Sequence, residues 1–185
     1  MRFVSWSSVV ALSLFAGCGG ASSGGGGFVA APSGAACASG LVYQGNRGSP
    51  EMNPGMACRS CHLGNNFDNQ NPGGLAEPGK AFFFMGTAYA SSREVNGCKS
   101  ANVPADAKIE ILDSRDVLQA TLPVNAAGNF FSSSTTAGFT LPYKARIVAN
   151  GKTLAMATPQ MDGDCNTCHT ENGKNGAPGR ITWAP

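Results

Sequence analysis

The chain of 185 residues has few charged residues and few long stretches without Gly or Pro. Only 13% of its residues are charged, 13 Lys and Arg stand against 11 Asp and Glu, and no run of basic residues occurs. A nucleic-acid surface needs concentrated positive charge, so we expect no nucleic-acid partner. Long amphipathic helices are also lacking, because 25 Gly and 11 Pro punctuate nearly every stretch. These absences argue against an all-helical fold.

Histidine is scarce as well, and both copies complete the same motif. The motifs are Cys58-Arg59-Ser60-Cys61-His62 and Cys165-Asn166-Thr167-Cys168-His169. Two Cys three positions apart on a helical turn project from roughly the same face, so both sulfurs can reach the two vinyl groups of one haem. The adjacent imidazole can then bind the iron. We predict two covalently attached haem c groups with the iron ligands His62 and His169. The attachment residues are Cys58, Cys61, Cys165 and Cys168.

Two other uses of the C-x-x-C pairs compete with haem attachment. A zinc site could combine both pairs, and either pair could act as a redox dithiol. The pairs lie roughly a hundred residues apart, and zinc ribbons are mostly intracellular. A dithiol leaves both histidines unexplained. Haem therefore accounts for the most residues.

The second axial position of each iron has no histidine left to fill it. The candidates are methionine or an open position that holds water. Met52 precedes the turn signal Pro54-Gly55 and could fold back over a haem, and Met156 ends an apolar stretch that returns towards the second motif. We predict Met52 and Met156 as iron ligands, with Met161 ranked third. A gap-filling core position is the alternative for each.

The N-terminal region has the features of a bacterial export signal. Residues 1–17 carry one positive charge, at Arg2, and an apolar run too short for a stable membrane-spanning helix. The small residues before Cys18 resemble a lipoprotein signal, which implies lipidation of Cys18, and Gly19 then favours the outer membrane. Residues 18–35 predict a flexible Gly/Ser-rich tether. Ordinary cleavage nearby with a free Cys18 is the alternative.

Cys37 and Cys98 remain after the other cysteines are assigned. An oxidising compartment favours a disulfide between them. Two separate buried thiols are the alternative.

The segment between the motifs has the pattern of β-strands. Short β-like runs alternate with turn signals at residues 81–89, 107–112, 117–122, 129–131, 143–148 and 153–156. Asn150-Gly151 between the last two runs is a strong hairpin signal. We predict a mainly β fold, a small antiparallel β-sandwich with short helical C-x-x-C-H segments before and after it. The expected order is signal peptide 1–17, lipid-anchored tether 18–35, first haem segment 36–79, sandwich 80–160, and second haem segment with the tail 161–185.

Local signals add detail to the second haem segment. Asp164 is a candidate cap for its helical turn, and Gly173 is a candidate end. Arg180 and Trp183 either contact a haem or belong to an ordinary packed tail. Because a sandwich can return its chain near its start, we expect the two haem segments to pack together.

The order of motif, sandwich and motif resembles a dihaem c-type cytochrome lipoprotein. The sandwich itself resembles the carboxypeptidase-regulatory-like and transthyretin-like family at residues 86–89, 107–113, 128–130 and 143–148 and at Thr121. That resemblance implies a non-catalytic structural or binding module.

These features predict an electron carrier rather than an enzyme. It would move electrons between redox partner proteins, or to an extracellular acceptor, from a lipid anchor in the outer membrane of a bacterial cell envelope. A surface binding or adhesion module with accessory haems is one alternative. A small peroxidase-like or reductase-like haem enzyme is the other, but it usually needs a distal acid or base.

Overall fold

The computed structural model describes residues 37–45, 48–60, 62, 82–132 and 139–183. The expected signal peptide and tether, Cys18 and Cys61 lie outside these residues. Within them the strands are β1 (Met85–Tyr89), β2 (Lys108–Asp113), β3 (Leu118–Pro123), β4 (Asn129–Phe131), β5 (Tyr143–Ala149), β6 (Lys152–Ala155) and β7 (Ile181–Thr182). Two short 3-10 helices, η1 (Cys58–Ser60) and η2 (Cys165–Thr167), coincide with the two motifs. In the described part of the chain, no helix has the length and apolar character needed to cross a membrane.

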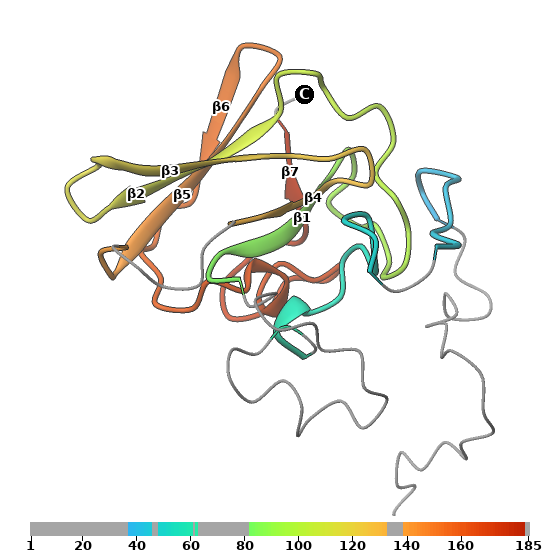
Figure 1. Ribbon diagram of the computed structural model, residues 1–185, viewed down its shortest axis with the longest axis horizontal. Coiled ribbons are helices and arrows are strands. Elements are labelled where there is room, and N and C mark those ends of the chain that lie inside the picture. The colour runs from blue at the N-terminus through green and yellow to red at the C-terminus, as the bar shows by residue number, and fades with distance from the viewer. Residues whose placement is uncertain (1–36, 46–47, 61, 63–81, 133–138, 184–185) are drawn as a thin grey trace, which may run out of the picture.

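The strands form two sheets (Figure 1). One has the order β4-β1-β7 and the other β3-β2-β5-β6. All pairs are antiparallel except β1 with β7, which is parallel. The predicted hairpin between β5 and β6 is confirmed, because Asn150 and Gly151 adopt φ values of 53° and 69°. Positive φ at both central residues matches the strand twist of a tight hairpin.

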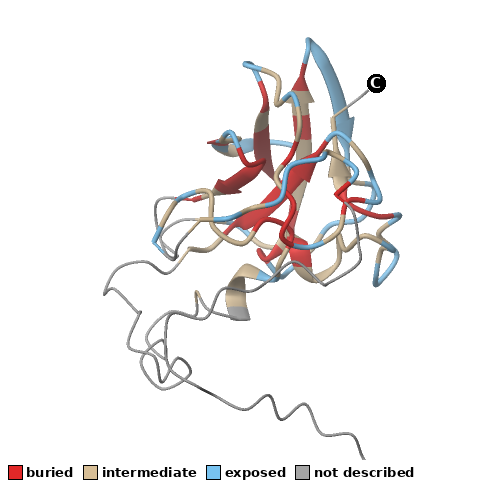
Figure 2. Cartoon of the chain, turned by 90° about the vertical axis from the view of Figure 1, so that its right-hand side faces the viewer, coloured by how far each residue is buried: buried red, intermediate tan, exposed pale blue. Residues whose placement is uncertain are grey.

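The core lies where the two sheets face each other. Phe84 and Ala88 enter it from the β1 side, and Ile109, Ile111 and Ile147 enter it from the opposite sheet. Figure 2 shows that the buried residues concentrate in the central strands, whereas β6 at the sheet edge is exposed. Apolar burial from both sheets is the main stabilising term of such a layered fold. The predicted mainly β sandwich is therefore confirmed.

Two details of the strands differ from expectation. β1 begins at Met85 rather than near residue 81. The short strand β7 was not predicted, and it pairs Ile181 with Ala88 and Thr182 with Tyr89. A strand of two residues is too short to show an alternating pattern. Its partner β1 is also nearly a hundred residues away in the chain, so no local signal predicts the pairing. The C-terminal tail is thus fastened to the strand that also supports the motifs.

Candidate functional site

Both C-x-x-C-H motifs fold into the same kind of turn. In the first, the backbone N–H of His62 donates to the carbonyl of Cys58 at 2.8 Å. In the second, the N–H of His169 donates to the carbonyl of Cys165 at 2.9 Å. The first cysteine and the histidine of each motif are thus one helical turn apart and lie on one side of it. The predicted helical segments are confirmed as single 3-10 turns.

The two turns lie side by side below β1 (Figure 1). Asn166 of the second motif donates through Nδ2 to the carbonyl of Met56 at 2.8 Å and lies 3.7 Å from Cys58 Sγ. On the surface, Arg59 Nη1 pairs with Asp162 Oδ1 at 2.9 Å. The expectation that the two segments pack together is therefore confirmed.

Strand β1 is the shared support of both turns. The N–H of Thr87 donates to Asn166 Oδ1 at 3.0 Å, and Thr87 Oγ1 accepts the N–H of Gly55 at 2.9 Å. A Cβ on Gly86 would lie 2.9 Å from the Cβ of Cys165, so only glycine lets η2 approach the strand this closely. Strand β1 thus binds the segment just before the first motif and the second motif itself.

Asp164 caps η2, as predicted, and it also reaches the first motif. Its Oδ1 accepts the N–H of Asn166 at 3.2 Å, and its Oδ2 accepts the N–H of Arg59 at 2.8 Å. The side chain is buried, and this burial raises the pKa of Asp164 although the backbone N–H groups oppose the shift. The prediction that Gly173 ends this turn is wrong, because η2 ends at Thr167 with Cys168 as its C-cap.

His169 is held in the tautomer that suits a metal ligand. Its Nδ1 lies 2.9 Å from the carbonyl oxygen of Gly179. A carbonyl can only accept, so Nδ1 carries the proton and Nε2 keeps a lone pair. Burial lowers the pKa of His169, which favours the neutral form. Orientation by a backbone carbonyl is common for metal-binding histidines.

His62 lies among aromatic rings. Its ring centroid is 5.1 Å from that of Phe82, which in turn lies 4.7 Å from the ring of Phe131 in β4. The first motif is therefore packed at the β4 side of the three-stranded sheet.

Burial disfavours the thiolate form of Cys58 and Cys165. Cys58, Cys165 and Cys168 are outside any disulfide. Burial raises the pKa of Cys58 above its usual range and that of Cys165 to about 12. A reactive dithiol needs a lowered pKa, because the thiolate is the nucleophile. The surroundings of Cys58 and Cys165 therefore argue against a reactive thiolate at the first cysteine of each motif.

The predicted methionine ligands occupy different settings. Met156 packs against the hydrophobic core, which matches the gap-filling alternative. Met52 is half-buried before the first motif, where its carbonyl accepts from Asn129 Nδ2 at 2.9 Å. Met161 is exposed beside Asp162, the residue paired with Arg59. Iron ligation by Met52 or Met156 stays a prediction.

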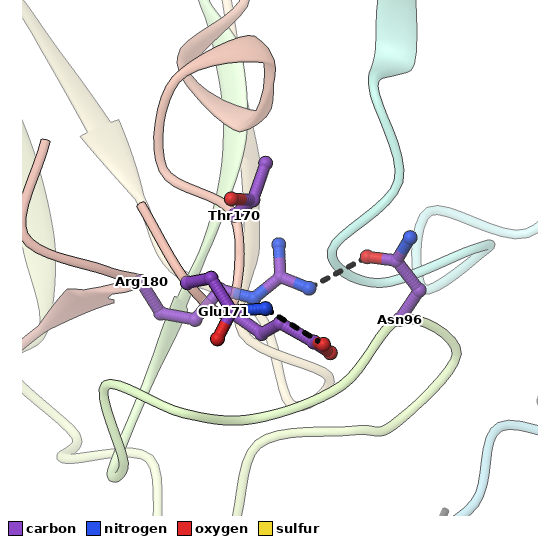
Figure 3. Close-up of a pocket in the computed structure, with 5 residues that line it drawn as sticks. Asn96, Thr170, Glu171 and Arg180 are labelled. Atoms are coloured by element: carbon purple, nitrogen blue, oxygen red, sulfur yellow. Dashed lines mark hydrogen bonds between the residues drawn. The ribbon is translucent and has the colours of Figure 1, made fainter. Parts of the chain in front are cut away.

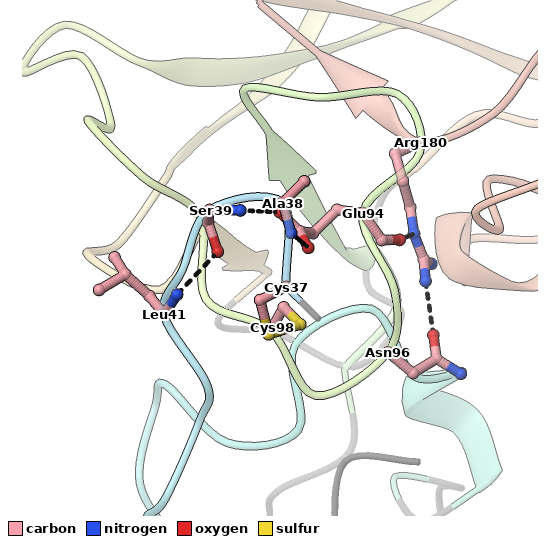
Figure 4. Close-up of a disulfide and its surroundings, with 8 residues drawn as sticks. All are labelled: Cys37, Ala38, Ser39, Leu41, Glu94, Asn96, Cys98 and Arg180. Atoms are coloured by element: carbon pink, nitrogen blue, oxygen red, sulfur yellow. Dashed lines mark hydrogen bonds between the residues drawn. A yellow bond between two sulfur atoms is a disulfide. The ribbon is translucent and has the colours of Figure 1, made fainter. Parts of the chain in front are cut away.

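The predicted disulfide joins Cys37 to Cys98, with the Cα atoms 5.6 Å apart (Figure 4). The buried carboxylate of Glu94 lies beside it and accepts the N–H groups of Ala38 and Ser39, each at 2.8 Å. Within the described residues, Cys37, Glu94 and Cys98 form the one group of three metal-type ligands close together. Both sulfurs belong to the disulfide, so this cluster stabilises a loop rather than offering thiolates to a metal.

Arg180 links Glu94 beside the disulfide to the second motif and to the segment just before the first. Its guanidinium donates to the carbonyl of Glu94 at 2.8 Å, to the carbonyl of Gly55 at 2.9 Å and to the carbonyl of His169 at 3.1 Å. It also donates to Asn96 Oδ1 at 2.6 Å. Arg180 therefore acts as a packed structural residue of the tail. Trp183 likewise packs against the core.

A polar cavity of about 380 Å³ lies next to the second motif (Figure 3). It is lined by Asn96, Thr170, Glu171, Asn172 and Arg180. Thr170 directly follows His169 in the chain, and His169 itself is not among the lining residues.

Sequence reasoning missed three residues that organise this site. Asn166 is a spacer residue of its motif, Thr87 is one of several β-strand threonines, and Glu94 lies in a loop. Their partners are distant in the chain, and no local pattern marks them. A polar residue within a buried strand, as at Thr87, is the one signal that was available.

No protein-family model, curated protein or solved structure matches the chain.

Proposed function

We propose that the protein is an exported dihaem c-type cytochrome that carries electrons. The observation that carries the proposal is the pair of like turns packed side by side, each presenting a C-x-x-C-H motif. The orientation of His169 by the Gly179 carbonyl supports iron binding through Nε2.

The residues present fit two haems. Cys58 and Cys61 would hold the first through thioether bonds, and Cys165 and Cys168 would hold the second. His62 and His169 would bind the irons, and the carbonyl of Gly179 fixes the ring of His169. When bound, each haem supplies a reversible one-electron couple at its iron.

Strand β1 would hold both haem-attachment segments in one arrangement. The N–H of Gly55, just before the first motif, donates to Thr87 Oγ1, and the N–H of Thr87 donates to Asn166 of the second motif. The two turns are also bonded to one another through Asp164 and Arg59. The chain's own contribution to electron transfer would be to keep the two attachment segments in place.

The cellular setting is part of the same proposal. Lipidation of Cys18, a tether over residues 18–35 and delivery to the outer membrane would place the sandwich at the cell envelope. The Cys37–Cys98 disulfide supports an oxidising compartment. Redox partner proteins or an extracellular acceptor would then exchange electrons with the haems, and the sandwich would serve as a non-catalytic scaffold.

The test is the haem content of the full chain exported in a bacterial host with c-type haem attachment machinery. We expect two haems per chain in a pyridine haemochrome assay. The double variants Cys58→Ser/Cys61→Ser and Cys165→Ser/Cys168→Ser should each retain one haem, and each serves as the control for the other.

Other outcomes separate the alternatives. Stoichiometric zinc without haem would replace the proposal with a zinc site. Two low-spin six-coordinate haems support a carrier, whereas a high-spin haem that binds carbon monoxide or peroxide would support a small haem enzyme.

A further inference from the structure

We infer that Asp164 is a positioning residue that fixes the two haems relative to one another, because its one carboxylate caps both haem-binding turns. This inference rests on the proposed function.

The cap bridges segments that are far apart in the chain. Oδ2 of Asp164 accepts the N–H of Arg59 in the first turn at 2.8 Å, across 105 positions. Oδ1 accepts the N–H of Asn166 in the second turn at 3.2 Å. The first N–H groups of any helical turn lack hydrogen-bond partners within that turn. Here one such N–H group of each turn donates to the same buried side chain, that of Asp164.

The bonds around Asp164 form a small buried network. Asn166 adds a second link, from the second turn to the segment just before the first, through its 2.8 Å bond to the carbonyl of Met56. The third link, between Arg59 and Asp162, is a surface ion pair whose side chains are 37% and 49% exposed. Exposed pairs contribute little, so the buried groups determine how the turns are oriented.

This orientation would pass to the cofactors. Each haem would be attached through the two cysteines and the histidine of one motif, so its orientation would follow the turn that holds it. A rotation of one turn against the other would then change the mutual orientation of the haems. Removing the shared cap would therefore alter the arrangement of the haems without removing an attachment residue.

The experiment compares Asp164→Ala, Asp164→Asn and a matched control in the haem-loaded full chain. Alanine removes both caps, whereas asparagine keeps one acceptor oxygen. The control is Asp106→Asn, because Asp106 also accepts two backbone N–H groups, those of Asn150 and Gly151 at 2.9 and 3.1 Å. Asp106 lies beside the β5–β6 hairpin, at the C-terminal end of β5, whereas Tyr143 begins the strand at its other end.

The readout is circular dichroism in the Soret band, where two nearby haems give a bisignate signal that depends on their mutual angle. We expect this signal in the wild type and in Asp106→Asn. Its amplitude should fall by about half or more in Asp164→Ala, with two haems still attached, and by less in Asp164→Asn.

Amide hydrogen exchange gives a second, haem-independent readout. Loss of the cap should speed exchange at Arg59 and Asn166 at least about fivefold in Asp164→Ala. Faster exchange with an unchanged Soret signal would make Asp164 a structural cap only and overturn the inference. A wild type that carries two haems without a bisignate signal would also overturn it. A chain that binds no haem would overturn the proposed function as well.

Discussion

At the scale of single residues, backbone groups orient the chemistry of the second motif. The carbonyl of Gly179 fixes the ring of His169. Gly179 has a φ of 150°, and a Cβ there would lie 2.6 Å from the carbonyl oxygen of Ser92. Glycine is therefore required for this carbonyl to reach the imidazole.

We expect Gly179→Ala to disturb the second haem selectively. The added Cβ must push the segment away from Ser92 and release the ring of His169. Two reduction potentials measured by spectroelectrochemistry should show a shift at one haem only, and stability should fall by about 1–3 kcal/mol. Gly151→Ala is the control, since its φ of 69° is also positive but no atom lies within 4 Å of the added Cβ. Unchanged potentials in Gly179→Ala would contradict the role given to this carbonyl.

Methionine ligation can be separated from methionine packing. Met52→Leu and Met156→Leu keep apolar volume, so each should cost less than about 1.5 kcal/mol. Loss of the thioether should nevertheless abolish a Met-to-iron band in the near-infrared spectrum at one haem. Met161→Leu is the comparison for the third-ranked candidate. If a spectrum keeps its full band, that methionine is not a ligand.

The residues named from the sequence share one property, which is that a local pattern marks them. The motif residues, the Asp164 cap and the remaining cysteine pair all follow from spacing or elimination along the chain. Asn166 and Glu94 do not, because an amide in a motif spacer and a loop carboxylate acquire their meaning from partners 79 and 56 positions away. Their roles depend on the tertiary fold.

At the scale of elements, β2 and β5 are joined by a charged cluster as well as by their ladder. Glu110 on β2 accepts from Arg146 Nε of β5 at 2.6 Å and pairs with Lys108 Nζ at 3.0 Å. The hydrogen bond from Lys108, followed by that from Arg146, lowers the pKa of Glu110 below its ordinary value of 4.5. Opposite charges across a strand pair stabilise the pairing.

This pKa shift predicts an acid dependence of stability. Because the pKa of Glu110 is lower in the folded state, its ion pairs stabilise the fold at pH values above the pKa of the unfolded chain. This stabilisation is lost as the pH falls through the pKa of the folded state. We expect the thermal midpoint to drop below about pH 4.5. The drop should be smaller in Glu110→Gln, which cannot titrate. Equal slopes of midpoint against pH in the two proteins would contradict this account.

The elements also show which patterns were predictive. The alternating runs and the Asn150-Gly151 turn identified β2, β3, β5 and β6 to within about a residue. The start of β1 was misplaced, because the phenylalanines at 82–84 extend its apolar run although the ladder begins at Met85. Apolar character alone does not reveal where a partner strand ends.

At the scale of the whole molecule, the disulfide closes a loop around the first motif. Cys37 and Cys98 are separated by 61 positions, and residues 58–62 lie between them. Arg180 connects this loop to the second motif through Glu94 and His169. In the unfolded chain the disulfide limits the freedom of residues 37–98, which include the first motif.

We expect Cys37→Ser/Cys98→Ser to lose about 2–4 kcal/mol of stability through this lost constraint. Thermal unfolding with and without reductant is the measurement. The wild type under reductant should approach the double variant, whose own midpoint should not respond. Alkylation of both residues in the untreated wild type would contradict the disulfide.

The shared cap also has a consequence for biosynthesis. On the proposed export route the chain emerges from its N-terminal end, so Arg59 leaves the membrane 105 positions ahead of the carboxylate that completes its turn. On that route, the enzymes that attach haem would meet the first motif before its cap is available. The second motif would follow, and its packing against the first would complete both turns, which would give maturation an order.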